Sequence, residues 1–444
     1  MTKTLILLAL VLLGPAAPTG AHANQPDGAA IPATAYAIPR ETAPEGEGYF
    51  SIVEGHNQRL YIGTHANAKN SWLVEFDPVE ERMEVVVDAH KAIGTDATGF
   101  GAQAKIHTRN NVGASGRIYF GTKQGYPAPG EPLTAYPGGY PMTYDPRTGR
   151  IEVFPIPVAH HGVISITPDE ARDLFYVSTC SDSRPIDHTH FLLYDRKTAQ
   201  YTDLMDCEHM YAFIVVDHAG RAYHPIRGGD IARYDPDTKQ LDRLTQTIDG
   251  HPPAPESHLR DENSHPINWD ISPDRKTLYA QPMSGNALYA YDLTAAGDTL
   301  PGRFLGPLIP GAERTDCRAL CAGPSGTVWC AVTTPARVGD GRRIAELHLV
   351  RYRLGTDAAP RDLGTVFVAN PGFKELTDED GEPLPGHGGF LVLESGRMVP
   401  RHVNLGVCEA RDGSVYSLAL QPYTLLKVSS DVLETLGPPG LSQP

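Results

Sequence analysis

Short runs of apolar and aromatic residues dominate this chain, and many of them alternate with polar residues before a turn containing Gly, Pro or Asp. Alternation over about four to eight residues is typical of a β-strand with one buried face. Few stretches keep the apolar period of a helix. We therefore predict an all-β protein with little helix.

Two phrases recur along the sequence. The first is a turn followed by a strand with an aromatic residue, and its seven copies are GHNQRLY, GASGRIY, PDEARDLFY, HAGRAY, PDRKTLY, PSGTVW and RDGSVY. The second is an aromatic residue, usually followed by Asp, then a polar turn and another strand. Its clearest copies are FDPVEERMEV, YDPRTGRIEV, YDRKTAQYTD and YDPDTKQLDR. Together they predict a repeated antiparallel unit of four strands.

Repeated four-stranded units that cannot bury both sheet faces alone close into a ring as a β-propeller. The seven copies of the first phrase predict seven blades within one domain at 24–430. The last blade has a third strand near Thr424–Ser429, and a strand from around residues 33–42 is expected to complete it and close the ring. We interpret 370–403 as an insertion between blades six and seven, and 431–444 as a C-terminal tail.

The first 23 residues have the features of a secretory signal peptide: a charged start, the apolar run Leu5–Leu13 and the cleavage-type sequence AHA. The apolar run is too short to span a bilayer, and no later run is long enough. We therefore expect a secreted or periplasmic protein without membrane insertion, and we expect a monomer. A formal net charge of −15 argues against a nucleic-acid partner, for which a basic footprint is expected.

Aligning the hairpins on their turns predicts which residues share one mouth of the ring. In a blade, the start of the inner strand and the end of the second strand lie on the same side. These two positions hold His107 and Lys123 in one hairpin, Tyr211 and Arg227 in another, and Tyr49 and His65 in the first. In the third blade, His160 or His161 falls near the first position and Cys180 takes the second.

Imidazole, phenol and cationic groups gathered at one mouth are suited to proton abstraction beside an anion. One group removes a proton, a second protonates the leaving oxygen, and a cation neutralises the carboxylate. On a polar rim, the same residues also occur for structural reasons, because strand ends are solvated or bond to neighbouring loops.

In architecture and at these positions, the sequence resembles the seven-bladed β-propeller polysaccharide lyases of the ulvan lyase and rhamnose–glucuronate lyase type. The resemblance implies β-elimination at a uronic acid, with His107 and Tyr211 as proton-transfer groups and Arg227 as the carboxylate clamp. Lys123, His65, His161, His160 and Tyr49 would complete the substrate pocket. The sequence departs from these lyases where a second histidine is expected about twenty residues beyond the first, because that stretch reads Lys123-Gln124-Gly125-Tyr126-Pro127.

Metal sites have weaker support in the sequence. Cys207 and His209, with His224 across the hairpin, are candidate ligands for a structural zinc ion, although buried thiols commonly serve packing. The loop residues Asp182, Asp187, His188 and His190 also carry ligand groups and read equally well as a polar loop. No cofactor is implied with certainty, and calcium or zinc in a structural role stays open.

Three functions follow as hypotheses. The first is an exported lyase for a uronate-containing polysaccharide or oligosaccharide, in which Tyr126, Tyr136 and Tyr140 could stack on sugar rings. The second is a metal-dependent lactonase or hydrolase that uses Asn404, Asn268 and Asp270. The third is a propeller that only binds a ligand or a partner, because this fold hosts many functions.

Overall fold

The computed structural model describes residues 29–45, 48–181, 188–208, 213–253, 267–283, 285–312, 315–337, 343–370, 391–392, 397–399, 404–419 and 423–436. The predicted signal peptide, Tyr211, His209 and most of the 370–403 segment lie outside these ranges. The described residues form an all-β fold, as predicted. Its helical parts are α1 (Ala89–Ile93), α2 (Ser430–Thr435) and the 3-10 turns η1 (Arg40–Thr42), η2 (Gly99–Gly101) and η3 (Leu133–Ala135).

The first antiparallel sheet has four strands, β2 (Ile52–Glu54), β3 (Leu60–Gly63), β4 (Trp72–Asp77) and β5 (Arg82–Asp88). The recurring aromatic of the first phrase, Tyr61, is buried in β3 and donates a hydrogen bond of 2.6 Å to Glu75 on β4. The recurring aromatic therefore anchors a strand to its neighbour as well as filling the core.

The second sheet contains β6 (Lys105–Ile106), β7 (Asn111–Val112), β8 (Ile118–Lys123), β9 (Pro141–Asp145) and β10 (Arg150–Val153). Its inner edge is interrupted between β6 and β7, where Thr108 Oγ1 accepts the Gly121 N–H at 3.0 Å. The interruption releases His107 from regular strand pairing.

The third sheet is a four-stranded antiparallel unit of β11 (Gly162–Asp169), β12 (Leu174–Cys180), β13 (His190–Asp195) and β14 (Gln200–Asp206). Its register shifts between Val163 and Ser165, close to the start of the inner strand. Regular alternation therefore does not predict on which face of the sheet the first side chains of β11 lie.

The fourth sheet has eight strands, β15 (Val215–Val216), β16 (Ala222–Pro225), β17 (Ile231–Asp235), β18 (Gln240–Ile248), β19 (Ile267–Ile271), β20 (Thr277–Pro282), β21 (Leu288–Asp292) and β22 (Thr299–Gly306). The strands form two antiparallel groups, β15–β18 and β19–β22. Parallel pairing of β18 with β22, from Thr245 opposite Thr299 to Ile248 opposite Gly302, joins the groups.

The fifth sheet has ten strands, β23 (Asp316–Ala322), β24 (Thr327–Arg337), β25 (Arg343–Arg353), β26 (Arg361–Val368), β27 (Leu391–Val392), β28 (Met398–Val399), β29 (Asn404–Glu409), β30 (Val415–Ala419), β31 (Thr424–Val428) and β1 (Ala30–Ala37). Strand β1 pairs antiparallel with β31 and parallel with β26. The expected N-terminal strand therefore completes the last group. Within the 370–403 segment, β27 and β28 pair with each other, and β28 extends the sheet at β26.

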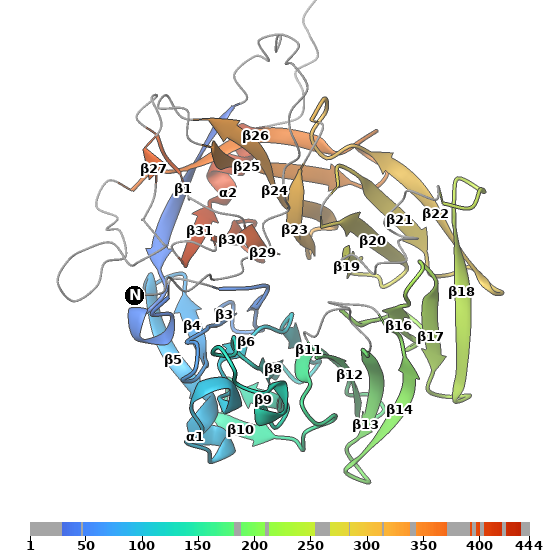
Figure 1. The fold of residues 1–444 in the computed structure, drawn as a ribbon. Helices are drawn as coiled ribbons and strands as arrows, with labels where there is room; N and C mark the ends of the chain where they lie inside the picture. Colours follow the sequence, from blue (N-terminus) through green and yellow to red (C-terminus); the bar gives the residue numbers. More distant parts are fainter. Residues whose placement is uncertain are drawn as a thin grey trace, which may run out of the picture.

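The sheets follow one another around a common centre, and β1, drawn in blue, lies beside the orange and red strands β26 and β31 (Figure 1). Hydrogen bonds link neighbouring inner strands: Asn111 Nδ2 donates to Ile166 O and Thr167 Oγ1 donates to Ile214 O, both at 2.8 Å. These bonds run from one strand group to the next, so they fix the order of the sheets around the centre.

Two carboxylates make matching contacts between neighbouring groups. Glu170 accepts from the Ser115 N–H and the Tyr119 hydroxyl at 2.6 and 2.8 Å. Glu409 accepts from the Ser325 N–H and the Trp329 indole at 3.0 and 3.1 Å. The turn serine and the recurring aromatic of one group thus bind an acid of the next group in both places.

The C-terminal tail begins with a short helix that the sequence analysis did not foresee. In α2, Val432 and Leu433 pack on the hydrophobic core that includes β1 and β26. The Ser429 side chain caps the helix by accepting the Val432 N–H. The residues directly after β31 therefore cover the sheet that β1 completes.

Candidate functional site

Six side chains from the first two sheets and the segments next to their strands gather in one place. We call them the His107 cluster: Tyr49, His65, Lys105, His107, Lys123 and Tyr126. Pairing of β6 with β8 places Lys105 opposite Lys123, and an isolated bridge places His65 opposite Lys105. Hairpin alignment therefore predicted four members, Tyr49, His65, His107 and Lys123, that lie near one another in the structure.

Aromatic contacts hold the His107 cluster together. The Tyr49 ring meets the His107 ring edge-on, with centroids 4.1 Å apart, and lies 5.5 Å from the His65 ring. The Tyr49 and Tyr126 hydroxyl oxygens are 2.7 Å apart and share a hydrogen bond. Two phenols and two imidazoles therefore surround one small region.

Lys105 places its ammonium group against both tyrosines. Its Nζ lies 3.6 Å from the centroid of the Tyr126 ring and 4.9 Å from that of Tyr49. A cation is attracted to the negative face of such a ring. The alignment of the hairpins considered one position per strand and therefore missed Lys105. Lys105 lies two residues before His107, and strand alternation places residues two apart on the same side.

The lysines and the imidazole are almost fully buried: Lys105 and His107 are 3% exposed, and Lys123 is 1% exposed. The close approach of β11 contributes to this burial, because a Cβ at Gly162 would lie 2.3 Å from Lys123 Cγ. Only a residue without a side chain can stand there unless Lys123 moves.

Burial and like charge shift the protonation of the cluster. Burial lowers the pKa of His107 well below its ordinary value, and the neighbouring charge of Lys123 lowers it further. The imidazole is therefore neutral at pH 7 and able to accept a proton. Burial, with a contribution from Lys105, lowers the pKa of Lys123 to about 7, so this amine changes charge in the physiological range.

The two histidines predicted from the third blade differ from each other in exposure. His161 is largely buried, its Nδ1 lies 3.2 Å from Thr179 Oγ1, and its ring is 5.3 Å from that of His190. His160 is exposed with a positive φ of 65°, and its Nδ1 lies 2.6 Å from Tyr136 O. Tyr136 is buried, so its ring fills the core.

The predicted clamp Arg227 lies on the loop after β16 and forms an ion pair with Glu208 at 3.2 Å. Its side chain is 49% exposed. Since Tyr211 lies outside the described residues, the Tyr211–Arg227 pairing that the lyase resemblance implies stays a prediction.

The candidate zinc ligands that the structure describes, Cys207 and His224, are both buried. Cys207 is buried, and burial raises the pKa of its thiol. His224 is buried with Nε2 3.0 Å from Ser178 Oγ and Nδ1 2.7 Å from Pro225 O. Within the described ranges, no three His, Cys, Asp or Glu side chains are arranged to hold a metal ion.

Two of the three residues predicted for a lactonase, Asp270 and Asn268, make contacts with other strand groups. Asp270 forms an ion pair with Arg109, and its Oδ2 accepts the Ala322 N–H at 2.8 Å. Asn268 Nδ2 donates to Arg318 O at 2.6 Å. A carboxylate already neutralised by a guanidinium is a poor ligand for a metal ion.

No protein family matches the sequence, and no curated protein does. Solved structures show a similar fold at low identity. The extracellular domain of the hybrid two-component system BT4673 from B. thetaiotaomicron has a TM-score of 0.50 and 9% identity over 90% of this chain. This chain spans 40% of the length of that one.

Two further structures give the same TM-score. The β-propeller domain of Cps50 (Swd1) from Myceliophteria thermophila matches at 0.50 with 12% identity, over 89% of this chain and 99% of that one. A fungal alcohol oxidase of the AA5 family in complex with copper matches at 0.50 with 11% identity, over 86% of this chain and 75% of that one. The fold is β-propeller-like. At these identities, the comparisons carry no information on activity.

Proposed function

We propose that this protein is an exported polysaccharide or oligosaccharide lyase that cleaves beside a uronic acid by β-elimination. The observation that carries the proposal is the co-location of a neutral imidazole, phenols and buried ammonium groups in the His107 cluster. Each of the three chemical roles of the reaction has a candidate group there.

The reaction breaks the C5–H and C4–O bonds of the uronate and forms a C4=C5 double bond. His107 accepts the C5 proton, and a tyrosine hydroxyl gives its proton to the departing O4 oxygen. Tyr49 is the phenol in contact with His107, and Tyr211 is the phenol that the lyase resemblance implies. Lys105, Lys123 or Arg227 neutralises the carboxylate, which stabilises the carbanion-like transition state.

The proposal includes a ring of seven blades. The eight-stranded sheet divides into two four-stranded antiparallel groups at the β18–β22 pair. The ten-stranded sheet divides in the same way at the β26–β1 pair. Counting each group as a blade gives the number that the sequence repeats predict, and β1 then serves as the closing strand.

Ultraviolet absorbance tests the proposal directly, because the unsaturated uronate product is conjugated and a hydrolysis product is not. We expect absorbance to rise when purified protein is mixed with a panel of uronate polysaccharides. The rate of this absorbance increase should be about 10²–10⁴-fold lower in His107→Ala, which is the range for loss of a general base. His218→Ala, an exposed histidine on a turn, is the matched control and should keep full activity.

Two outcomes would replace the proposal. New reducing ends without absorbance would indicate a hydrolase. Saturable binding of the same polysaccharides with no product would indicate a binding module, which is the alternative that a propeller scaffold leaves open.

A further inference from the structure

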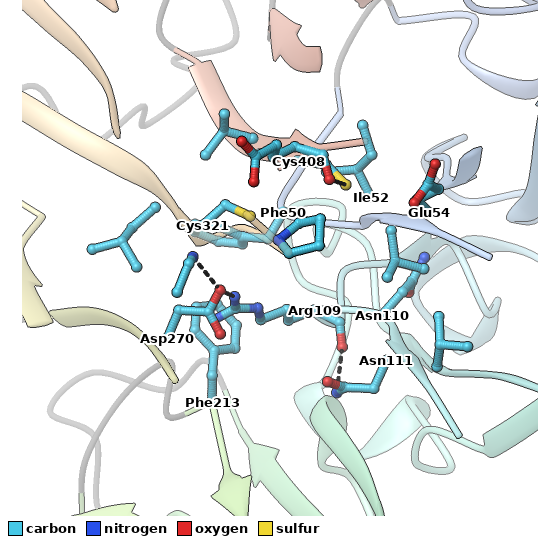
Figure 2. A pocket seen from close by; sticks show the side chains of 18 of the residues that line it. Phe50, Ile52, Glu54, Arg109, Asn110, Asn111, Phe213, Asp270, Cys321 and Cys408 are labelled. Atoms are coloured by element: carbon cyan, nitrogen blue, oxygen red, sulfur yellow. Dashed lines mark hydrogen bonds and ion pairs between the residues drawn. The ribbon is translucent and has the colours of Figure 1, made fainter. Parts of the chain in front are cut away.

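A separate cavity of about 270 Å³ lies among the inner strands β2, β7, β19, β23 and β29. Phe50 lines this cavity, and its ring also contacts His107 with centroids 5.3 Å apart. Phe213 is a second lining ring, 5.2 Å from Phe50. We call this space the Arg109 cavity, because Arg109 extends through it toward Asp270 (Figure 2).

The Arg109 cavity offers both donors and acceptors. Arg109 donates to Trp269 O and pairs with Asp270, which occupies part of its five N–H groups. Asn268 is 3% exposed, and its Oδ1 has no hydrogen-bond partner in the described parts of the chain. Leaving a buried amide oxygen unsatisfied is costly, so this acceptor is available to a ligand hydroxyl or amide that donates to it.

Two of the three carboxylates that line the Arg109 cavity are paired with an arginine. Asp270 is paired with Arg109, and Glu54 with Arg411 at 3.4 Å. No lining cation remains without a carboxylate in the described ranges, so an anionic ligand gains little here. Glu409 already accepts three hydrogen bonds from Ser325 and Trp329, so it offers little to an amine.

A polar, uncharged ligand that presents hydroxyl groups and an apolar ring face matches this lining. Hydroxyl groups donate to amide oxygens and accept from guanidinium N–H groups, while C–H faces pack on phenyl rings. Arg411, whose side chain is 43% exposed, marks where the lining reaches the surface. We propose that the Arg109 cavity is a second binding site, which takes a neutral monosaccharide and is distinct from the His107 cluster.

Calorimetric titration with methyl glycosides of glucose, galactose and mannose, and with glucuronate as the charged comparison, tests this inference. For ligands of this size, we expect a Kd on the order of 1 mM for at least one methyl glycoside. Asn268→Leu should weaken that binding by about tenfold or more, because it removes the unsatisfied acceptor.

The control variant is Lys123→Met, which changes the His107 cluster and should leave binding of the neutral glycoside unchanged. Thermal unfolding checks that each variant is folded, and Asn268→Ala is the second lining variant if Asn268→Leu does not fold. Three results would overturn the proposal: no saturable binding of any glycoside, unchanged binding in the folded lining variant, or loss of binding in Lys123→Met.

Discussion

The His107 cluster and the Arg109 cavity share the Phe50 ring, yet they bury charge in opposite ways. In the cluster, two lysines and an imidazole lie together, and burial, with a further contribution from the like charges, lowers the pKa of both Lys123 and His107. In the cavity, each arginine faces a carboxylate, as Arg109 does with Asp270. Side chains whose protonation the protein has shifted are candidates for chemistry, whereas a satisfied ion pair holds two elements in place.

The largest expected difference is in activity. Lys105→Met should lower kcat/KM on a responsive uronate polysaccharide by about 10²–10³-fold, if the ammonium stabilises the developing charge. Asp270→Asn, at the other region, should change it by no more than about threefold. Product absorbance measures both activities. An equal loss in both variants would show that the His107 cluster is not the chemical region and the Arg109–Asp270 pair is not only structural.

For the free energy of unfolding, we expect a large effect at Asp270, where the effect on activity is small. Asp270→Ala leaves Arg109 without its carboxylate and frees the Ala322 N–H. Because the pair is partly buried, with side chains 19% and 16% exposed, we expect a loss of about 3 kcal/mol in the free energy of unfolding. Urea denaturation measures this, and a double variant with leucine at both positions should lose less.

Lys123 should be destabilising at neutral pH. Its folded pKa of about 7 lies below the ordinary lysine value of 10.5, so between these values the unfolded chain binds more protons than the folded one. Stability therefore rises with pH across this window. Lys123→Met should remove that rise and increase the free energy of unfolding at pH 7 by about 1–3 kcal/mol.

The same titration predicts the pH profile of the proposed reaction. If the Lys123 ammonium acts, kcat/KM should fall above a pH of about 7 as the amine loses its proton. Lys123→Arg keeps its charge over this range and should move the alkaline limb upward. The acid limb should lie well below pH 6.5, because His107 stays neutral there.

The smallest expected effect compares two contacts of the same design. Ser325→Ala removes a donor to Glu409 beside the Arg109 cavity, and Ser115→Ala removes a donor to Glu170 elsewhere in the ring. Each should lower the free energy of unfolding by about 1 kcal/mol. A much larger loss for Ser325→Ala would show that the cavity side carries more of the stability of the ring.

Local patterns were enough to predict the strands and part of the cluster. The turn-and-aromatic phrase fixes the position of each hairpin, so counting from the turn located Tyr49, His65, His107 and Lys123. The parallel joins between β18 and β22 and between β26 and β1 were not predicted, because they depend on outer strands of different groups meeting at their edges.

The Arg109 cavity could not be predicted from the sequence for a similar reason. Arg109 and Asp270 belong to different sheets, and no local spacing relates them. The unsatisfied oxygen of Asn268 is likewise visible only after packing has excluded its other partners. The register shift between Val163 and Ser165 shows that regular alternation also breaks within an inner strand.

The pairing of β1 with β31 has a consequence for how the protein folds. Tyr36 lies opposite Leu425, so this contact joins segments from opposite ends of the described chain. Loop-closure entropy makes such contacts slow to form, and a high contact order lowers the folding rate. During synthesis, β1 emerges early and has no antiparallel partner until β31 follows, so completion of the ring is expected to be the last and slowest step.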